Sequence, residues 1–498
     1  MAGVVEYKVM EGRSFSKTIR RYRGELLLCV LAAVLLVPNV MNAFAFGAEN
    51  VEGFSVKLAN MPVPEMLGVT AADVHPPLYY LILRIAVLVC GNHVFVYRFV
   101  SLIPYLILVI FALTVLRRTF GPWCAAVFLT FASMTTTALR YNTHIRMYSW
   151  CALFLTLAFY ILYRIMRDGR RKDYVLLAVF TLCAGYLQYY ALVTAALLYL
   201  FLLVLLLVKK DGAALRNWLL SAGIALAGYL PWLTVFLRSF QRTAGEHWMP
   251  QTESFLTSYK SIFSARFSLV WPTLWLLLTA YAVYAGRRSG KGTEKDNWLL
   301  AGVVCVIGTV LAGLLISALT RPMYNTRYLY PASPVAWMSL GVCAERIPWK
   351  KYIVPAILAV FLVFQTLSYL RTLQTRLPVD AQMRQAVETV QKKGTDGAVL
   401  VSEEPIGGYD DKVILDMGYA TGPMTDFYFR GIAEEVRIDP ADPTGWALPQ
   451  TGQCFLFAEE ALQGDAVRLL EERGFSVECI SEGGFRAYSI YYLLPQEE

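Results

Sequence analysis

Asp73 and His75 stand directly before a Pro-Pro pair and an apolar run, in the stretch ADVHPPLYYLIL at 72–83. Carboxylate and imidazole groups can take or pass a proton, and Pro suits the first turn of a helix. Further along, LRYNTHIRMYSW (139–150) and TRPMYNTRYLYPASP (320–334) are rich in Arg and Tyr. The planar donor fork of Arg matches phosphate oxygens. These residue types predict a site that binds a phosphate group and moves a proton.

The elements that must position these residues are membrane helices. The chain has 498 residues, of which 57% are hydrophobic and only 16% charged. Apolar runs of about 18 to 25 residues recur, which predicts a mainly α polytopic membrane protein with about eleven spans. The expected spans are roughly 26–46, 97–116, 121–139, 148–166, 174–188, 190–208, 214–237, 270–286, 297–319, 327–344 and 352–370. Residues 77–90 are apolar but short, so we expect a helix near the membrane surface there.

Orientation follows from the basic residues, because Lys and Arg in short loops stay on the cytoplasmic side. Basic clusters occupy alternate loops of the span list: 17–23, 117–118, 164–172, 209–210, 287–295 and 346–351. This alternation predicts a plasma-membrane protein with a cytoplasmic N-terminus and an extracytoplasmic C-terminus. A cleaved signal peptide ending near AFA (43–45) is the alternative. We interpret 26–46 as a retained span because the basic region and the apolar run are both long for such a peptide.

The last part of the chain has a different composition. Residues 371–498 hold 11 basic and 22 acidic side chains, net −11, against 34 and 15 in 1–370, net +19. The overall charge of +8 is therefore a sum of opposed parts and does not indicate nucleic acid. The segments GAVLVSEEP, CFLFAEEALQGDAVRLLEERGFSVECIS and FRAYSIYYLL predict a small α/β domain after a linker near 371–380. We therefore expect a transmembrane domain at 1–370 and an extracytoplasmic domain at 371–498.

Two features of this tail have competing interpretations. The stretch EEPIGGYDD has two interpretations: a site for a ligand or an ion, or a polar turn after a strand. We favour the polar turn. Cys454 and Cys479 would fall at offset positions of successive strands, farther apart than the 7 Å Cα separation that a disulfide tolerates. We expect all nine cysteines of the chain to be packing residues.

Reactive groups gather on the outer side of this topology. The acids predicted there are Glu49, Glu52, Glu65, Asp73, Glu246 and Glu253, and the histidines are His75, His93, His144 and His247. A single Arg at an outer helix end is usually an interfacial anchor. Several Arg and Tyr residues beside acids and imidazoles instead favour a pocket for a phosphate head group.

The motifs DVHPPLYYLIL, YRFVSLIPYL, RYNTHIRMY and TRYLYPASP resemble one family over most of 25–370. They are similar to the lipid-linked-sugar glycosyltransferases of the GT-C fold, in the branch of protein O-mannosyltransferases and aminoarabinose transferases. The resemblance implies a polyprenyl-phosphate-linked sugar as donor and inverting transfer of a hexosyl or pentosyl group. It also implies an extracytoplasmic active site under the first outer loop, with a carboxylate in that loop acting as base.

Site residues follow from this resemblance together with the census of outer groups. Relatives commonly have an Asp-Glu pair where this chain reads AENVEGFSV at 48–56, so Glu52 matches the second member. Glu52 is the first candidate for the base, with Glu49 and Asp73 as alternatives. The side chains expected to bind the donor phosphate or substrate are His75, Tyr79, Arg146, Tyr148, Arg327 and Tyr328.

Cofactor and partner predictions are less specific. No metal-binding spacing is present, and a divalent ion held by His75, His144 or His247 stays an alternative. The expected partners are the lipid-linked sugar, membrane lipids and an acceptor that is a glycan, a lipid or a protein. A flippase of lipid-linked sugars is the second function; it predicts charged residues deep in spans or inverted repeats, which the sequence does not show. A structural scaffold would leave the outer Arg and His residues without a role.

Overall fold

The fold was analysed in a computed structural model of the chain. The structure describes residues 24–48, 50–73, 75–245, 253–288, 294–320, 322–395, 399–402, 428–429, 434–437, 453–458, 464–485 and 488–495. Glu49, Glu246, His247 and the acidic stretch EEPIGGYDD lie outside these ranges.

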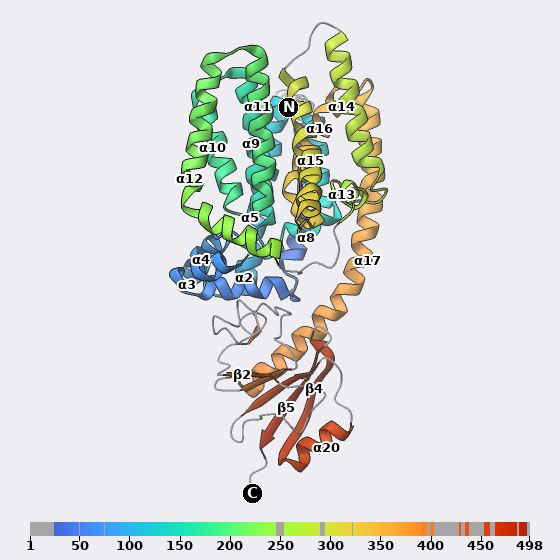
Figure 1. Ribbon diagram of the computed structural model, residues 1–498. Coiled ribbons are helices and arrows are strands. Elements are labelled where there is room, and N and C mark those ends of the chain that lie inside the picture. Colours follow the sequence, from blue (N-terminus) through green and yellow to red (C-terminus); the bar gives the residue numbers. More distant parts are fainter. Residues whose placement is uncertain are drawn as a thin grey trace, which may run out of the picture.

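A bundle of helices forms most of the molecule (Figure 1). Its helices are Gly24–Ala43, α5 (Val94–Phe111), α7 (Pro122–Met134), α9 (Tyr148–Asp168), α10 (Arg171–Gly185), α11 (Tyr189–Lys209), α12 (Gly212–Gly245), α14 (Val270–Arg288), α15 (Glu294–Leu319), α16 (Ser333–Arg346) and α17 (Lys350–Lys393). A π-helical turn, Ala112–Leu116, continues α5 into α6 (Arg117–Thr119). Each of the eleven predicted spans overlaps one helix of this bundle, although 121–139 runs past the end of α7 and 327–344 begins six residues before α16.

The predicted number of spans is not confirmed. Within the described residues, seven helices are long and apolar enough to cross a membrane; α7, α10, α14 and α16 are shorter or less apolar. The 13 residues of α7 rise about 20 Å, less than the ~30 Å of a hydrocarbon core. Every residue of α7 from Cys124 onward is buried, as is α16 from Ser333 to Ala344. These two helices are apolar because protein surrounds them, a situation that composition does not distinguish from lipid.

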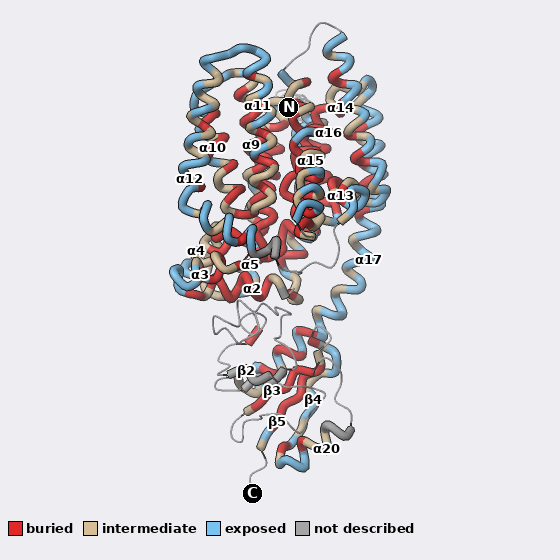
Figure 2. The backbone as a smooth tube through the Cα atoms, in the orientation of Figure 1, coloured by how far each residue is buried: buried red, intermediate tan, exposed pale blue. Residues whose placement is uncertain are grey.

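Burial separates the inside of the bundle from its outer surface. Figure 2 shows long exposed stretches on α12 and α17 and buried backbone between the other helices. The exposed side chains include Leu226 of α12 at 72% and Val363 of α17 at 58%. Large apolar side chains exposed along whole helices are typical of a lipid-facing surface. The chain is an integral membrane protein.

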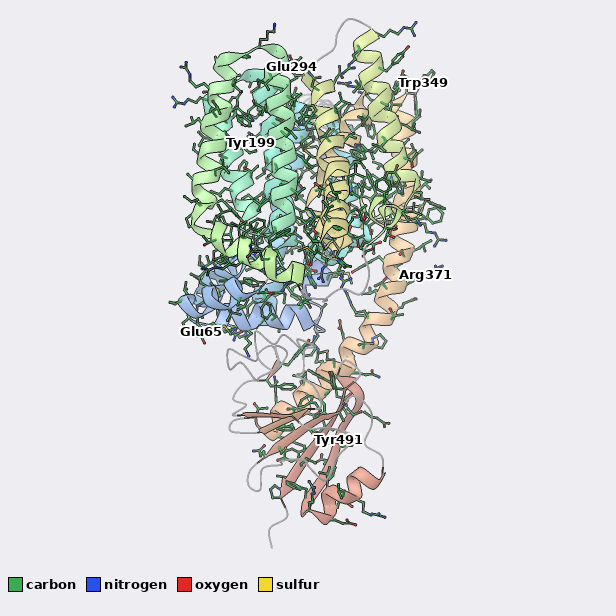
Figure 3. All side chains as sticks on the ribbon, viewed as in Figure 1. Glu65, Tyr199, Glu294, Trp349, Arg371 and Tyr491 are labelled. Carbon is green, nitrogen blue, oxygen red and sulfur yellow. The ribbon has the colours of Figure 1, made fainter. Side chains whose placement is uncertain are left out.

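Loops predicted for the two membrane sides lie at opposite ends of the bundle. Figure 3 shows Glu294 and Trp349 at one end and Glu65 at the other. At the end of Glu294, acids pair with the basic loop residues: Asp173 with Arg164 at 2.7 Å and Asp296 with Arg346 at 2.5 Å. The acids and bases assigned to one side thus meet there.

The end of the bundle near Glu65 is covered by three helices, α2 (Asn50–Asn60), α3 (Val63–Ala72) and α4 (Leu78–Cys90) (Figure 1). The helix predicted at 77–90 is confirmed as α4, which begins directly after the Pro-Pro pair; its predicted place near the membrane surface stays a prediction. Shorter helices α8 (Thr136–Tyr141), α13 (Phe255–Ser261) and η2 (Thr326–Ala332) belong to the loops of this end. Together these elements frame the region where the predicted site residues fall.

The C-terminal part is a small sheet domain, as predicted. Its strands are β1 (Val399–Ser402), β2 (Glu434–Arg437), β3 (Cys454–Ala458), β4 (Phe475–Phe485) and β5 (Tyr488–Pro495), with α20 (Gly464–Glu472) between β3 and β4. The order is β2-β1-β3-β5-β4, with β1 parallel to both neighbours and β5 antiparallel to β3 and β4. Because β5 separates β3 from β4, Cys454 and Cys479 lie two strand spacings apart, and both are free thiols.

The predicted linker before this domain is not confirmed. The predicted linker at 371–380 is instead the middle of α17, a helix of 44 residues that leaves the bundle and ends beside the sheet (Figure 1). The predicted domain boundary at residue 370 therefore falls inside one helix. Local composition changes there from apolar to charged, but a helix that passes from membrane to water needs no break in its backbone.

The C-terminal part of α17 and Tyr428 hold the segment that leads into α2. The Oδ1 atom of Asp380, in α17, accepts a hydrogen bond from the backbone N–H of Gly47 at 2.9 Å. The hydroxyl of Tyr428 accepts from the N–H of Ala48 at 2.7 Å and donates to the carbonyl of Phe46 at 2.9 Å. A Cβ at residue 47 would lie 2.6 Å from the Asp380 carboxylate, so a larger residue here would displace that side chain from its present position.

Candidate active site

A cavity of about 120 Å³ opens at the end of the bundle that α2, α3 and α4 cover. Residues from five separate parts of the chain line it: His75 before α4, the first turn of α11, the end of α12, Ile316 of α15, and Met323 and Tyr328 near η2. The lining is mainly aromatic and aliphatic, with a few polar groups. Such a composition is typical of sites for small or lipid-like ligands.

The motif around His75 forms a chain of three polar side chains. His75 Nδ1 lies 3.0 Å from Asp73 Oδ2, and His75 Nε2 lies 2.9 Å from Arg146 Nη2. Arg can only donate hydrogen bonds, so Nε2 must be the acceptor. Nδ1 must then carry the hydrogen and donate it in a hydrogen bond to Asp73. The imidazole is therefore neutral, and its orientation is set from both sides.

Burial lowers the pKa of His75 from its ordinary value of about 6.5, and the positive charge of Arg146 lowers it further. The carboxylate of Asp73 opposes both effects, and Arg327 adds a smaller lowering. The direction of the shift agrees with the neutral imidazole inferred from the hydrogen bonds. At neutral pH this side chain can accept a proton.

Glu52 lies in a buried ion pair in α2. Its side chain is 1% exposed, and its two oxygens accept from Arg98 Nη1 at 3.2 Å and Nη2 at 3.3 Å. Oε1 also accepts from the backbone N–H of Ile145 at 2.8 Å. Arg98 Nη2 donates in addition to the carbonyl of Gly47 at 2.6 Å. Glu52 thereby joins α2, α5 and the segment that carries Arg146.

Arg98 was not predicted as a site residue. It is the single charged side chain within the apolar stretch of α5, and a lone ionisable residue in such a stretch usually has a buried partner and a function. That signal was present in the sequence. Its partner was not, because 46 residues separate Arg98 from Glu52.

Arg327 and Tyr328 lie in η2, where the side chain of Asn325 accepts from the backbone N–H of Arg327 at 3.0 Å. Arg327 Nη2 donates to the hydroxyl of Tyr328 at 3.2 Å, and the Tyr328 ring stacks on Tyr190 with centroids 5.2 Å apart. Among the described residues, Arg327 has no carboxylate partner, and its buried Nε has no hydrogen-bond acceptor. A guanidinium in this state is suited to bind an anion from outside the protein.

The two arginines predicted to bind phosphate both act electrostatically on His75. Arg146 and Arg327 both lower the pKa of His75, and each interacts electrostatically with the other. Tyr148, at the start of α9, is close enough for both charges to act on it. Two guanidinium groups that repel one another beside a cavity favour the binding of a negatively charged group between them.

The remaining predicted residues lie at the margin of this arrangement. The hydroxyl of Tyr79 is 2.8 Å from Ser101 Oγ, inside the protein. His144 packs against the rings of Tyr141 and Tyr148. In the part of the chain that the structure describes, no three metal-ligating side chains converge. Glu49 and His247, named above as a candidate base and a candidate ligand, lie outside that part.

One family model matches part of the chain. The model described as dolichyl-phosphate-mannose-protein mannosyltransferase aligns with residues 74–236, about one third of the sequence. The matched segment contains His75 and Arg146, whereas Glu52 and Arg327 lie outside it. Curated proteins give no significant sequence match.

Solved structures are similar over nearly the whole chain. The crystal structure of ArnT from Cupriavidus metallidurans in the apo state has a TM-score of 0.63 and 13% identity, and covers 94% of this chain and 97% of that one. The same protein bound to undecaprenyl phosphate gives a TM-score of 0.59, 13% identity, and 94% and 98% coverage. At this identity the likeness concerns the fold. The GT-C fold with a C-terminal sheet domain, predicted from the sequence, is confirmed.

Proposed function

We propose that this protein is an inverting glycosyltransferase that moves a sugar from a polyprenyl-phosphate carrier to an acceptor hydroxyl. The match to a mannosyltransferase family model and the fold shared with a protein solved with undecaprenyl phosphate support this proposal. One observation carries it: a neutral His75, oriented by Asp73, lines a cavity beside Arg146 and Arg327. A proton acceptor next to paired cations is what transfer from a lipid phosphate requires.

The reaction in this site balances without a further reactant. The acceptor oxygen attacks the anomeric carbon of the donor sugar, and the bond between that carbon and the phosphate oxygen breaks. The proton of the acceptor hydroxyl passes to the base, and the polyprenyl phosphate leaves with one additional negative charge. Arg146 and Arg327 stabilise that charge, which is larger in the transition state than in the donor.

We propose His75 as the group that takes the proton, with Asp73 holding it in the reactive tautomer. When Arg146 turns toward the phosphate, its hydrogen bond to His75 Nε2 is released. Nε2 is then free to take the proton of the sugar acceptor's hydroxyl. Glu52, the first candidate from sequence, already accepts three hydrogen bonds from Arg98 and Ile145, which occupy most of its roughly four lone-pair positions. Its proposed role is to hold the loop of Arg146 in place. Glu49 is the alternative carboxylate.

The proposal also covers the membrane side of the site, the roles of the two domains and the kind of acceptor. The site and the C-terminal domain face the extracytoplasmic side, and the N-terminus is cytoplasmic, as the basic loops predict. Residues 1–370 form the catalytic membrane domain, and 371–498 form an outer domain that governs access of a glycan, lipid or protein acceptor. The transferred group is a hexose or a pentose.

Measurements of transfer and of donor binding, made separately on purified protein, test the proposal. Replacing a general base costs about 10²–10⁴ in turnover, so His75→Gln should lose turnover by this factor and keep donor affinity. Arg327→Ala should weaken donor binding, and Arg327→Lys should restore only part, because Lys lacks the planar fork.

The Glu52→Gln and Glu49→Gln variants locate the base. If Glu49→Gln loses turnover while His75→Gln keeps it, the base lies in the first outer loop. If the wild-type protein neither binds nor turns over any polyprenyl-phosphate sugar, the proposed function is wrong.

A further inference from the structure

Gln188, at the start of α11, is a buried polar side chain without a partner. It is 3% exposed and lines the cavity that also contains His75. Its backbone N–H donates to the carbonyl of Ala184 at 3.0 Å. Among the described residues, neither Oε1 nor Nε2 of its carboxamide has a hydrogen-bond partner.

Gln365 in α17 is a buried glutamine of the same protein whose carboxamide has hydrogen-bond partners within the protein. Its Oε1 accepts from the backbone N–H of Arg266 at 3.0 Å, and its Nε2 donates to the carbonyl of Met134 at 2.7 Å. Leaving a buried amide unpaired costs free energy, and buried polar groups in native proteins are nearly always paired. The two hydrogen bonds of Gln365 explain a polar residue at that position. No hydrogen bond within the described residues explains one at Gln188.

The other polar groups that line the cavity have partners within the described residues, and the hydroxyl of Tyr190 has a hydrogen bond with Ser317. Ser239 Oγ donates to the carbonyl of Asp73 at 2.6 Å, and the hydroxyl of Tyr189 accepts from Trp232 Nε1 at 3.2 Å. The hydroxyl of Tyr328 accepts from Arg327. The rest of the lining is apolar, including Phe236, Phe240, Ile316 and Met323. Among these polar groups, the carboxamide of Gln188 is the one that has no hydrogen-bond partner within the described residues.

The chemistry of a carboxamide selects among the parts of the donor. It offers both a donor and an acceptor, so its natural partner is a group that also does both. An ionised phosphate only accepts, and a prenyl chain does neither. A sugar hydroxyl donates and accepts, and the stacked rings of Tyr190 and Tyr328 give the apolar face of a sugar a flat surface to rest on.

We propose that Gln188 recognises a hydroxyl of the donor sugar and thereby determines which sugar the protein accepts. This inference rests on the proposed function and adds a specificity determinant to it. Since His75 lines the same cavity, the recognised hydroxyl belongs to the sugar whose anomeric carbon reacts.

Binding of lipids to the full chain in nanodiscs tests the inference. The probes are undecaprenyl phosphate and undecaprenyl-phosphate carrying glucose, mannose, galactose or aminoarabinose. The wild type should bind one glycosylated lipid more tightly than undecaprenyl phosphate. Gln188→Leu should reduce that preference about tenfold or more and leave the affinity for undecaprenyl phosphate unchanged, because a buried hydrogen bond is lost only with the sugar.

Gln365→Leu is the matched control. It should lower the melting temperature, since two satisfied hydrogen bonds disappear, and keep the sugar preference. Gln188→Leu should not lower the melting temperature. A Gln188→Leu protein that keeps the full preference, or that loses undecaprenyl phosphate equally, overturns the inference. So does a wild type that binds all five lipids alike, whereas a wild type that binds none of them overturns the proposed function as well.

Discussion

At the scale of single residues, the site depends on how a few charges are placed around one imidazole. Arg146 fixes the tautomer of His75 by donating to Nε2, and Asp73 accepts the proton of Nδ1. The same guanidinium lowers the pKa of the ring and so favours its neutral form. In the proposed mechanism this arginine also binds the donor phosphate. In that mechanism one side chain links the binding of the phosphate to the acceptance of the proton.

The lowered pKa of His75 predicts how activity and stability depend on pH. The folded protein keeps the ring neutral below 6.5, where an unfolded chain would protonate it, so kcat/KM should stay level down to about pH 6.5 and fall only below it. The free energy of unfolding should likewise decrease as the pH falls below about 6.5 toward the pKa of the folded state. A pH series of transfer rates and of chemical unfolding measures both.

Two variants distinguish the pH dependence that arises from His75 from the pH dependence of other groups. Asp73→Asn removes the charge that raises the pKa of His75, so the acid limb of its remaining activity should move to lower pH. His75→Gln should remove the corresponding part of the pH dependence of stability. An acid limb above pH 6.5 in the wild type would contradict the assignment of His75 as base.

Sequence reasoning found most side chains of the site but not their partners. Asp73 and His75 are neighbours in sequence, so their contact was visible in the motif, and Arg146 was suggested by its residue type. The pairing of Glu52 with Arg98 and the unpaired state of Gln188 depend on packing between distant helices. No local pattern encodes such contacts, because they exist only once α2, α5 and α11 are assembled.

At the scale of elements, the helices were predictable and their surroundings were not. Apolar runs predicted a segment that overlaps each helix of the bundle, yet α7 and α16 are interior helices that pack on one another. Gly341 of α16 allows this packing, since a Cβ there would lie 2.7 Å from the carbonyl oxygen of Cys124. The close approach explains a small residue at this position.

Gly341→Ala should therefore destabilise the protein. Overpacking of a core usually costs about 1–3 kcal/mol, and here the clash is with backbone, which cannot rotate away. Thermal unfolding in detergent measures the effect. Gly223→Ala in α12 is the control: nothing lies within 4 Å of its added methyl group, and Ala favours a helix more than Gly does. Equal melting temperatures for the two variants would contradict the proposed packing.

At the scale of the whole molecule, the proposed orientation rests on the alternation of basic loops. A reporter that is active only in the cytoplasm should stay inactive when fused after Glu498. The same reporter inserted between α9 and α10, after Gly169, should be active, because that loop lies among the basic residues at the other end of the bundle. The reverse pattern would place the site on the wrong side for an extracytoplasmic acceptor.

The contacts of Gly47 have a consequence for exchanging parts between related proteins. Its N–H binds Asp380 of α17 and its carbonyl binds Arg98, the partner of Glu52. One residue, through the two peptide groups that flank it, thus connects α17 to the buried ion pair. A chimera that receives a foreign tail without an acid at position 380 should lose the hydrogen bond to Gly47, and with it the position of the segment that leads into α2. The tail and the loop should be inherited together, and transplanting Asp380 into such a chimera should restore transfer.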